Sequence, residues 1–248
     1  MTDMSETYFD PDGDLRLEVG PDKANCVVCS RTLSRASAVW KKMLNGPFLE
    51  SRPRDGEWIV ELPEDDYKAL TLVLNILHFR FDRIPDPTTL TVDELFNLTI
   101  LTDKYDLAHL LRPWVRPLSG SLLSQDHDLR LLWIAWELGH MRLFRDIAER
   151  VLSSAFLDQT GSLCYQTAGP LKSYDYINAL GILDGIEKTR ATRTADMVEC
   201  LRVLYQRFID GNPGASGICK HAKRLGQVRA SDNNANTNGN PRHIHRGA

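Results

Sequence analysis

The sequence lacks any hydrophobic run near the roughly 18 residues that would predict a membrane-spanning helix. Its N-terminal segment MTDMSETYFDPDGD is acidic, with neither the basic start nor the apolar stretch of a secretion signal. Charge of one sign is not in excess either, since 30 Lys and Arg stand against 33 Asp and Glu. These absences predict an intracellular protein, cytoplasmic or nuclear, with no membrane partner.

Cysteine is scarce: five residues, an odd number widely scattered, do not form a disulfide framework and indicate a reducing compartment. Two of them form the Cys-x-x-Cys pair Cys26 and Cys29, a spacing found in redox centres and in half zinc sites. In a strand, residues three apart point to opposite faces and lie about 10 Å apart. Because no second pair completes a zinc site, we expect small core residues rather than metal or redox chemistry.

Catalytic and cofactor motifs are also absent. The sequence has no Gly-x-Ser-x-Gly elbow, no glycine-rich phosphate loop and no His-Glu-x-x-His. The segment DPDGD at 10–14 has the alternating acids of a calcium loop, but Leu15 and Pro21 occupy the positions where that loop needs Gly and Glu. His78, on an apolar helix, is expected to be a hydrogen-bonded core histidine. We therefore predict no catalytic, metal-binding or cofactor-binding residues.

The N-terminal half alternates between strand and helix patterns. Residues 15–19, LRLEV, alternate apolar and polar side chains and predict a strand, and the small apolar residues 26–29 predict a second. A helix from Ser30 or Thr32 to Leu44 follows, with its apolar residues at helical spacing. Residues 57–62 predict a third strand. The acids in PEDD, residues 63–66, predict the start of a helix that reaches Phe81 and has a wide apolar stripe.

The remaining patterns are helical. A capping box, Thr91 to Glu94, opens a helix that ends near residues 103–106, and a short helix follows over 109–113. After residue 117 we find no strand pattern. LRLLWIAWELG and MRLFRDIAERVLSSAF predict two helices separated by Gly139, SLCYQTAGP predicts a loop, and residues 194–209 predict the last helix.

The C-terminal segment 211–248 is rich in Gly, Asn and Pro and is predicted to be disordered. It carries six Lys and Arg against Asp232, a basic composition that could reach nucleic acid. It lacks the interleaved aromatic residues of a single-strand binder, so nucleic acid is an unlikely partner. A metal cluster of Cys219 and His221 with Cys200 is disfavoured, because Cys200 belongs to an apolar helical stripe.

Several stretches together resemble the BTB/POZ domain: DLRLEV at 14–19, CVVCSRTLSRASAVWKKML at 26–44, WIVEL at 58–62 and LTDKYDL at 101–107. The helical remainder is loosely similar to the C-terminal extension of single-BTB proteins abundant in fungi. The resemblance implies an α+β BTB/POZ fold followed by an all-α region. The expected organisation is a flexible N-terminus (1–7), a BTB/POZ domain (8–117), a helical extension (118–210) and a disordered tail (211–248).

The resemblance implies a non-enzymatic protein–protein interaction module that commonly forms homodimers and often acts as a substrate adaptor on a cullin scaffold. An alternative is a chromatin-associated regulator that uses the basic tail. Repressor-type members have an acid at the position of Asp14 and a basic residue at the position of Ser30. In this chain the basic residue, Arg31, comes one position later. Cullin-binding members carry a short motif of a hydrophobic residue, any residue and an acid. Residues Val92 to Glu94 are similar to this motif, and they also fit a helix cap. Asp14, Arg31, Val92 and Glu94 are therefore the candidate interaction residues.

Overall fold

The computed structural model describes residues 6–114, 128–165, 169–178 and 181–210. Over these residues the chain has a mixed α+β fold, as the sequence predicts. It divides into two compact units, Met1–Leu183 and Asp184–Ala248. The predicted tail, 211–248, and the predicted end of the first domain at residue 117 lie outside the described residues.

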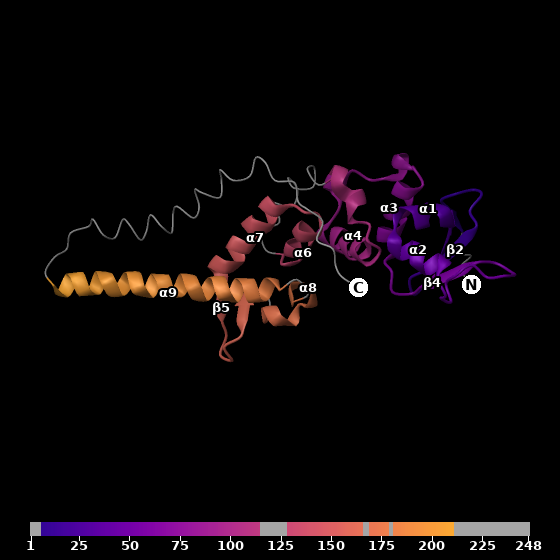
Figure 1. Cartoon of the computed structure of the whole chain (residues 1–248). Coiled ribbons are helices and arrows are strands. Elements are labelled where there is room, and N and C mark those ends of the chain that lie inside the picture. Colours follow the sequence, from indigo (N-terminus) through magenta and orange to yellow (C-terminus); the bar gives the residue numbers. More distant parts are fainter. Residues whose placement is uncertain (1–5, 115–127, 166–168, 179–180, 211–248) are drawn as a thin grey trace. The chain divides into compact units, whose positions relative to one another are not determined.

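The N-terminal part of the first unit contains a four-stranded sheet with the order β1-β3-β2-β4. Strands β2 and β4 are labelled in Figure 1. The central strand β2 pairs antiparallel with β3, where Leu17 faces Cys26, and parallel with β4. The alternation of LRLEV buries every second side chain of β2. The two-residue strand β1 was not predicted and begins at Thr7, inside the segment expected to be flexible. The strands are β1 Thr7–Tyr8, β2 Leu15–Val19, β3 Ala24–Val28 and β4 Ile59–Leu62.

The single helix predicted after the second strand is wrong, because two helices, α1 Ser30–Ala36 and α2 Ala38–Asn45, meet at Ser37. Ser37 has an extended backbone (φ −134°, ψ 128°), and its side chain accepts a hydrogen bond from the Trp40 amide (3.0 Å). This is the geometry of a helix N-cap, so Ser37 ends one helix and starts the next. The helical spacing of apolar residues continues across the break and therefore does not reveal it.

Helix α3 (Tyr67–Leu77) is shorter than predicted. Asp66 caps its start instead of lying in its first turn, and the helix ends before Phe79, whose φ of +59° is incompatible with a continuing right-handed helix. Phe81 lies in the short 3-10 helix η1 (Phe81–Arg83) and is exposed. His78 is hydrogen-bonded as expected: Nε2 accepts from the Cys29 amide (3.1 Å), and Nδ1 lies 2.9 Å from the Leu74 carbonyl.

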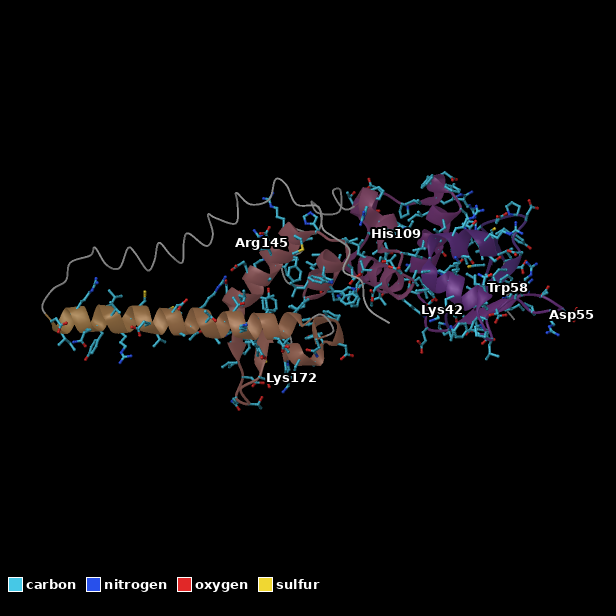
Figure 2. The ribbon with its side chains drawn as sticks, in the orientation of Figure 1. Lys42, Asp55, Trp58, His109, Arg145 and Lys172 are labelled. Atoms are coloured by element: carbon cyan, nitrogen blue, oxygen red, sulfur yellow. The ribbon has the colours of Figure 1, made fainter. Side chains whose placement is uncertain are left out.

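Helix α4 (Val92–Lys104) begins with the predicted capping box. The Thr91 side chain accepts from the Glu94 amide, and the Glu94 carboxylate accepts from the Thr91 amide. The 3-10 helices η2 (Pro87–Thr89) and η3 (Ala108–Trp114) lie on either side of α4 along the chain. Trp58, labelled in Figure 2, lies directly before β4 and donates its indole N–H to the Glu50 carbonyl (2.8 Å).

The rest of the first unit is not all helical, so the predicted all-α region is wrong. Helices α6 (Arg130–Glu137) and α7 (Met141–Ser154) form as expected, and α6 packs against both α4 and α7. A two-stranded antiparallel sheet of β5 (Ala155–Leu157) and β6 (Leu163–Tyr165) then appears where a helix end and a loop were predicted. The 3-10 helix η4 and helix α8 follow, at Leu171–Ser173 and Asp175–Asn178.

The last helix, α9 (Ile182–Ile209), begins twelve residues before its predicted start. Its N-terminal half is rich in Thr, Lys and Arg and carries no apolar period, so the pattern indicates only the second half. None of the helices in the described ranges combines the length and apolar character needed to cross a bilayer.

Candidate functional site

The Asp65 carboxylate, between β4 and α3, is a buried charged group of the first unit. Only 2% of the Asp65 side chain is exposed. Its two oxygens have separate partners at the end of α4: Lys104 Nζ lies 2.6 Å from Oδ1, and the Tyr105 hydroxyl donates to Oδ2 at 2.6 Å. A buried carboxylate needs such partners, because its lost hydration is otherwise uncompensated.

Tyr105 connects this pair to the core. Its ring stacks on the buried Trp40 ring, with centroids 4.5 Å apart, and its carbonyl accepts a hydrogen bond from the Ser37 hydroxyl (2.6 Å). Burial raises the pKa of the Tyr105 hydroxyl well above its usual range, and the Asp65 carboxylate raises it further. Tyr105 is therefore a permanent hydrogen-bond donor. The network of Asp65, Lys104, Tyr105, Trp40 and Ser37 joins the start of α3, the end of α4 and the junction of α1 and α2.

A groove of about 1080 Å³ opens beside this network. Four carboxylates and one ammonium group line it, so its charge is acidic, while Tyr67 and Ile100 expose apolar surface to it. Three segments build the groove: the turn between β2 and β3, the segment before α3 and the C-terminal half of α4. The lining charged residues are Asp22, Glu64, Asp65, Asp66 and Lys104.

The acids of the groove differ in how far they are already engaged. Both oxygens of Asp65 are occupied, and Asp66 caps α3 by accepting from the Ala69 amide (2.8 Å). Asp22 and Glu64 are exposed and make no hydrogen bond or ion pair with any described residue. They are consequently the two acids most accessible to an incoming cation. Within the described ranges, no group of three or more His, Cys, Asp or Glu side chains has the spacing of a metal site.

Asp14, the first of the predicted interaction residues, serves the fold. Its carboxylate accepts from the backbone amide (2.8 Å) and the hydroxyl (2.9 Å) of Ser30, the first residue of α1. Burial raises the Asp14 pKa, but the Ser30 hydrogen bonds outweigh it, so the net pKa lies below the ordinary value. Arg52, at 3.6 Å, is the nearby cation. Asp14 thus accepts from the first residue of α1 and anchors the start of that helix, while part of its side chain stays exposed.

None of the other predicted interaction residues forms a hydrogen bond or ion pair with Asp14 in the described part of the chain. Arg31 is exposed in the first turn of α1, next to the Asp14 partner Ser30. Val92 is buried, and Glu94 closes the capping box of α4 while lying 3.8 Å from Lys68. The Val92–Glu94 step therefore starts a helix, and its hydrophobic member is not available to a partner.

The cysteine pair does not lie within one strand as predicted. β3 ends at Val28, and Cys29 is the N-cap residue of α1, half-buried, whereas Cys26 is buried in the sheet. Both thiols are free. Burial raises the pKa of the Cys26 thiol to about 12, which opposes the thiolate that redox or metal chemistry would need.

The residues that build the groove were not identified from the sequence. Asp65 is one of three adjacent acids in PEDD, and the alternation of apolar residues does not distinguish the one that turns inward. The only available signal was the polar Asp-Lys-Tyr ending of an apolar helix, at residues 103–105. Neither a protein-family model nor a curated protein matches the chain.

Proposed function

We propose that the chain is a BTB/POZ-type protein–protein interaction module without enzymatic activity, and that the groove beside Asp65 binds a basic segment of a partner protein. The observation that carries this proposal is an acidic groove with accessible carboxylates at Asp22 and Glu64, built on a buried network. A rigid wall supports recognition because little conformational freedom is lost when a ligand binds.

The chemistry of the groove favours binding over catalysis. Tyr105 keeps its proton, and the Asp65 carboxylate already accepts two short hydrogen bonds. The apolar surface of Tyr67 and Ile100 suits the aliphatic stem of a Lys or Arg, whose charged end would reach the carboxylates. A segment that combines a basic residue with an apolar neighbour fits these features.

A random 12-residue peptide library displayed on phage tests the groove. We expect the immobilised protein to enrich peptides that contain Lys or Arg. Reversing the two accessible acids in Asp22→Lys/Glu64→Lys should weaken the best peptide at least about ten-fold, because electrostatic attraction becomes repulsion. The matched control Asp12→Lys/Asp55→Lys makes the same charge change at exposed positions that do not line the groove.

Two results would contradict the groove proposal. The first is a library that yields no basic consensus, and the second is a set of enriched peptides that bind both double variants with the same affinity. Circular dichroism of the two variants distinguishes loss of binding from loss of folding.

The finer proposal that the module is an adaptor on a cullin scaffold has its own test. Light scattering of the chain mixed with the N-terminal part of a cullin should show the mass of a complex if the adaptor role is right. The buried Val92 and the helix-capping Glu94 do not support this role through the Val92–Glu94 step. Absence of a complex would remove the adaptor role and leave the groove proposal intact.

A further inference from the structure

Helix α9 carries an apolar face that no described part of its own unit covers. Seven side chains in its C-terminal half share an arc of about 140° at 100° per residue. Six of them are between 58% and 81% exposed. They are Met197, Val198, Leu201, Leu204, Tyr205, Phe208 and Ile209.

The opposite side of the helix is mainly polar, although it also carries the partly exposed Val203, and its polar side chains bond to one another within the helix. Glu199 and Arg202 form an ion pair at 3.9 Å, and Gln206 donates to Asp210 at 3.2 Å. Side chains of both kinds project along α9 in Figure 2. The helix is therefore amphipathic over this half, and an amphipathic helix is normally stabilised by packing of its apolar face.

We infer that this face binds the same face of a second copy of the chain, with the two helices antiparallel. Met197, Leu201, Leu204 and Phe208 follow each other at intervals of 4, 3 and 4 residues. This is the seam spacing of two helices that pack knobs into holes. A second copy has that spacing by necessity, so the seam is self-complementary.

The antiparallel direction follows from side-chain size. With Leu201 opposite Leu204 of the other copy, Met197 lies opposite Phe208. The two-fold axis repeats each of these facing pairs, so the seam contains each pair twice. Each Phe ring then meets a flexible thioether, a favourable contact. A parallel pair would instead place Phe208 against Phe208 at one end and Met197 against Met197 at the other, so two aromatic rings would have to share one layer.

One flank of the seam extends the antiparallel contact. Val198 lies near Tyr205 of the other copy in this register, and both side chains are more than half exposed in the single chain. The other flank has Cys200 and Arg207 at its edge. In this register Arg207 lies near Cys200 of the other copy, so the flank does not bring two like charges together. Antiparallel helices also align their dipoles favourably.

The chain that follows α9 is a poor alternative occupant. Residues 211–248 contain four large aliphatic side chains, Ile218, Leu225, Val228 and Ile244, and no aromatic residue. These four are separated by Gly, Asn, Pro and charged residues and do not repeat at a helical or strand interval. A second α9 offers seven apolar side chains at the matching interval.

The interface is small, because the 13 residues from Met197 to Ile209 span only about 20 Å of helix. Its buried area belongs at the low end of the range for specific protein–protein interfaces, so we expect a micromolar dissociation constant. Sedimentation equilibrium of the full chain over micromolar to submillimolar concentrations should show a mass rising from the 28.1 kDa of one chain toward twice that value.

Two substitutions that add the same charge to the same helix test the seam. Leu201→Glu places a carboxylate in the centre of the apolar face and should raise the dimer dissociation constant at least about 100-fold. Gln206→Glu places it on the polar side and should leave the constant unchanged. Circular dichroism of both variants checks that α9 remains helical.

Cysteine cross-linking tests the direction in a Cys200→Ser background. The double variant Leu201→Cys/Leu204→Cys should form intermolecular disulfides under mild oxidation, while Leu201→Cys alone should not. Strong cross-linking of Leu201→Cys alone would mean a parallel pair.

The self-association proposal is overturned by a monomeric wild-type chain at the highest concentration, or by a dimer that Leu201→Glu leaves intact. The second result would assign dimerisation to the first unit. Because α9 does not line the groove, either outcome leaves the peptide-library experiment interpretable.

Discussion

At the scale of single residues, the buried Asp65 carboxylate depends on its two partners, Lys104 and Tyr105. Its hydrogen bond from the Tyr105 hydroxyl lies in a buried site, where loss of a partner costs more than the same loss at the surface. The Tyr105 ring also stacks on Trp40, so a conservative substitution separates the hydroxyl from the ring.

Tyr105→Phe keeps the ring stack and removes the donor to Asp65. We expect the free energy of unfolding, measured by urea titration, to fall by about 1–3 kcal/mol. Tyr67→Phe removes a hydroxyl that lies 3.3 Å from an exposed Thr7 hydroxyl and should change stability by less than about 0.5 kcal/mol. Equal effects of the two substitutions would show that the buried hydrogen bond is not a major contributor.

His78 makes stability depend on pH. Burial lowers the His78 pKa below its ordinary value of 6.5, with a further lowering by Arg80 that is opposed by the Leu74 carbonyl and by Asp10. Because the unfolded chain binds the proton more tightly, His78 contributes full stability above about pH 6.5 and loses it as the pH falls toward the folded-state pKa. The hydrogen bond from the Cys29 amide acts in the same direction as burial, because Nε2 cannot accept it when protonated.

Urea unfolding of the wild-type chain at pH 7.5 and about pH 5.5 should therefore show lower stability at the lower pH. His78→Gln removes the titrating group, and the difference between the two pH values should become smaller. An unchanged pH dependence in His78→Gln would assign the effect to groups other than His78.

At the scale of elements, Ser37 joins three parts of the first unit with one hydroxyl. It caps α2 through the Trp40 amide and donates to the Tyr105 carbonyl. Ser37→Ala should lower the free energy of unfolding by about 1–3 kcal/mol, since a cap and a buried hydrogen bond are lost together. Ser34→Ala in the preceding helix removes only the exposed acceptor of Asn45 and should cost less than about 0.5 kcal/mol.

Elements with strong local signals were predictable from the sequence. β2 has the predicted bounds because LRLEV alternates without exception, and α4 starts where Thr91 and Glu94 form a capping box. The break at Ser37 was missed because apolar residues on both sides keep a helical spacing. β5 and β6 are three residues each, too short to show alternation.

The candidate groove could not be predicted for a different physical reason. Local pattern shows which residues lie on one face of an element, but the partners of Asp65 come from another helix about 40 residues later in the chain. Which of several adjacent acids turns inward depends on where Lys104 and Tyr105 arrive. That information is tertiary and is not contained in any short window of sequence.

At the scale of the whole chain, the two units expose surfaces of different character. The first unit has an acidic groove with carboxylates that lack partners among the described residues, and the second has an apolar helical face. The two surfaces should respond differently to salt. We expect added NaCl to weaken peptide binding in the groove and to leave α9 self-association unchanged or stronger. Fluorescence anisotropy and sedimentation at low and high salt measure the two effects.

The late position of Lys104 and Tyr105 also constrains how the protein is made. A ribosome delivers Asp65 about 40 residues before either partner. Until then, closing the core over Asp65 would enclose a lone negative charge, which is strongly unfavourable. We therefore expect the core around Asp65 to close only after α4 has emerged during translation, and a transcript truncated within α4 should yield a product that proteases degrade rapidly.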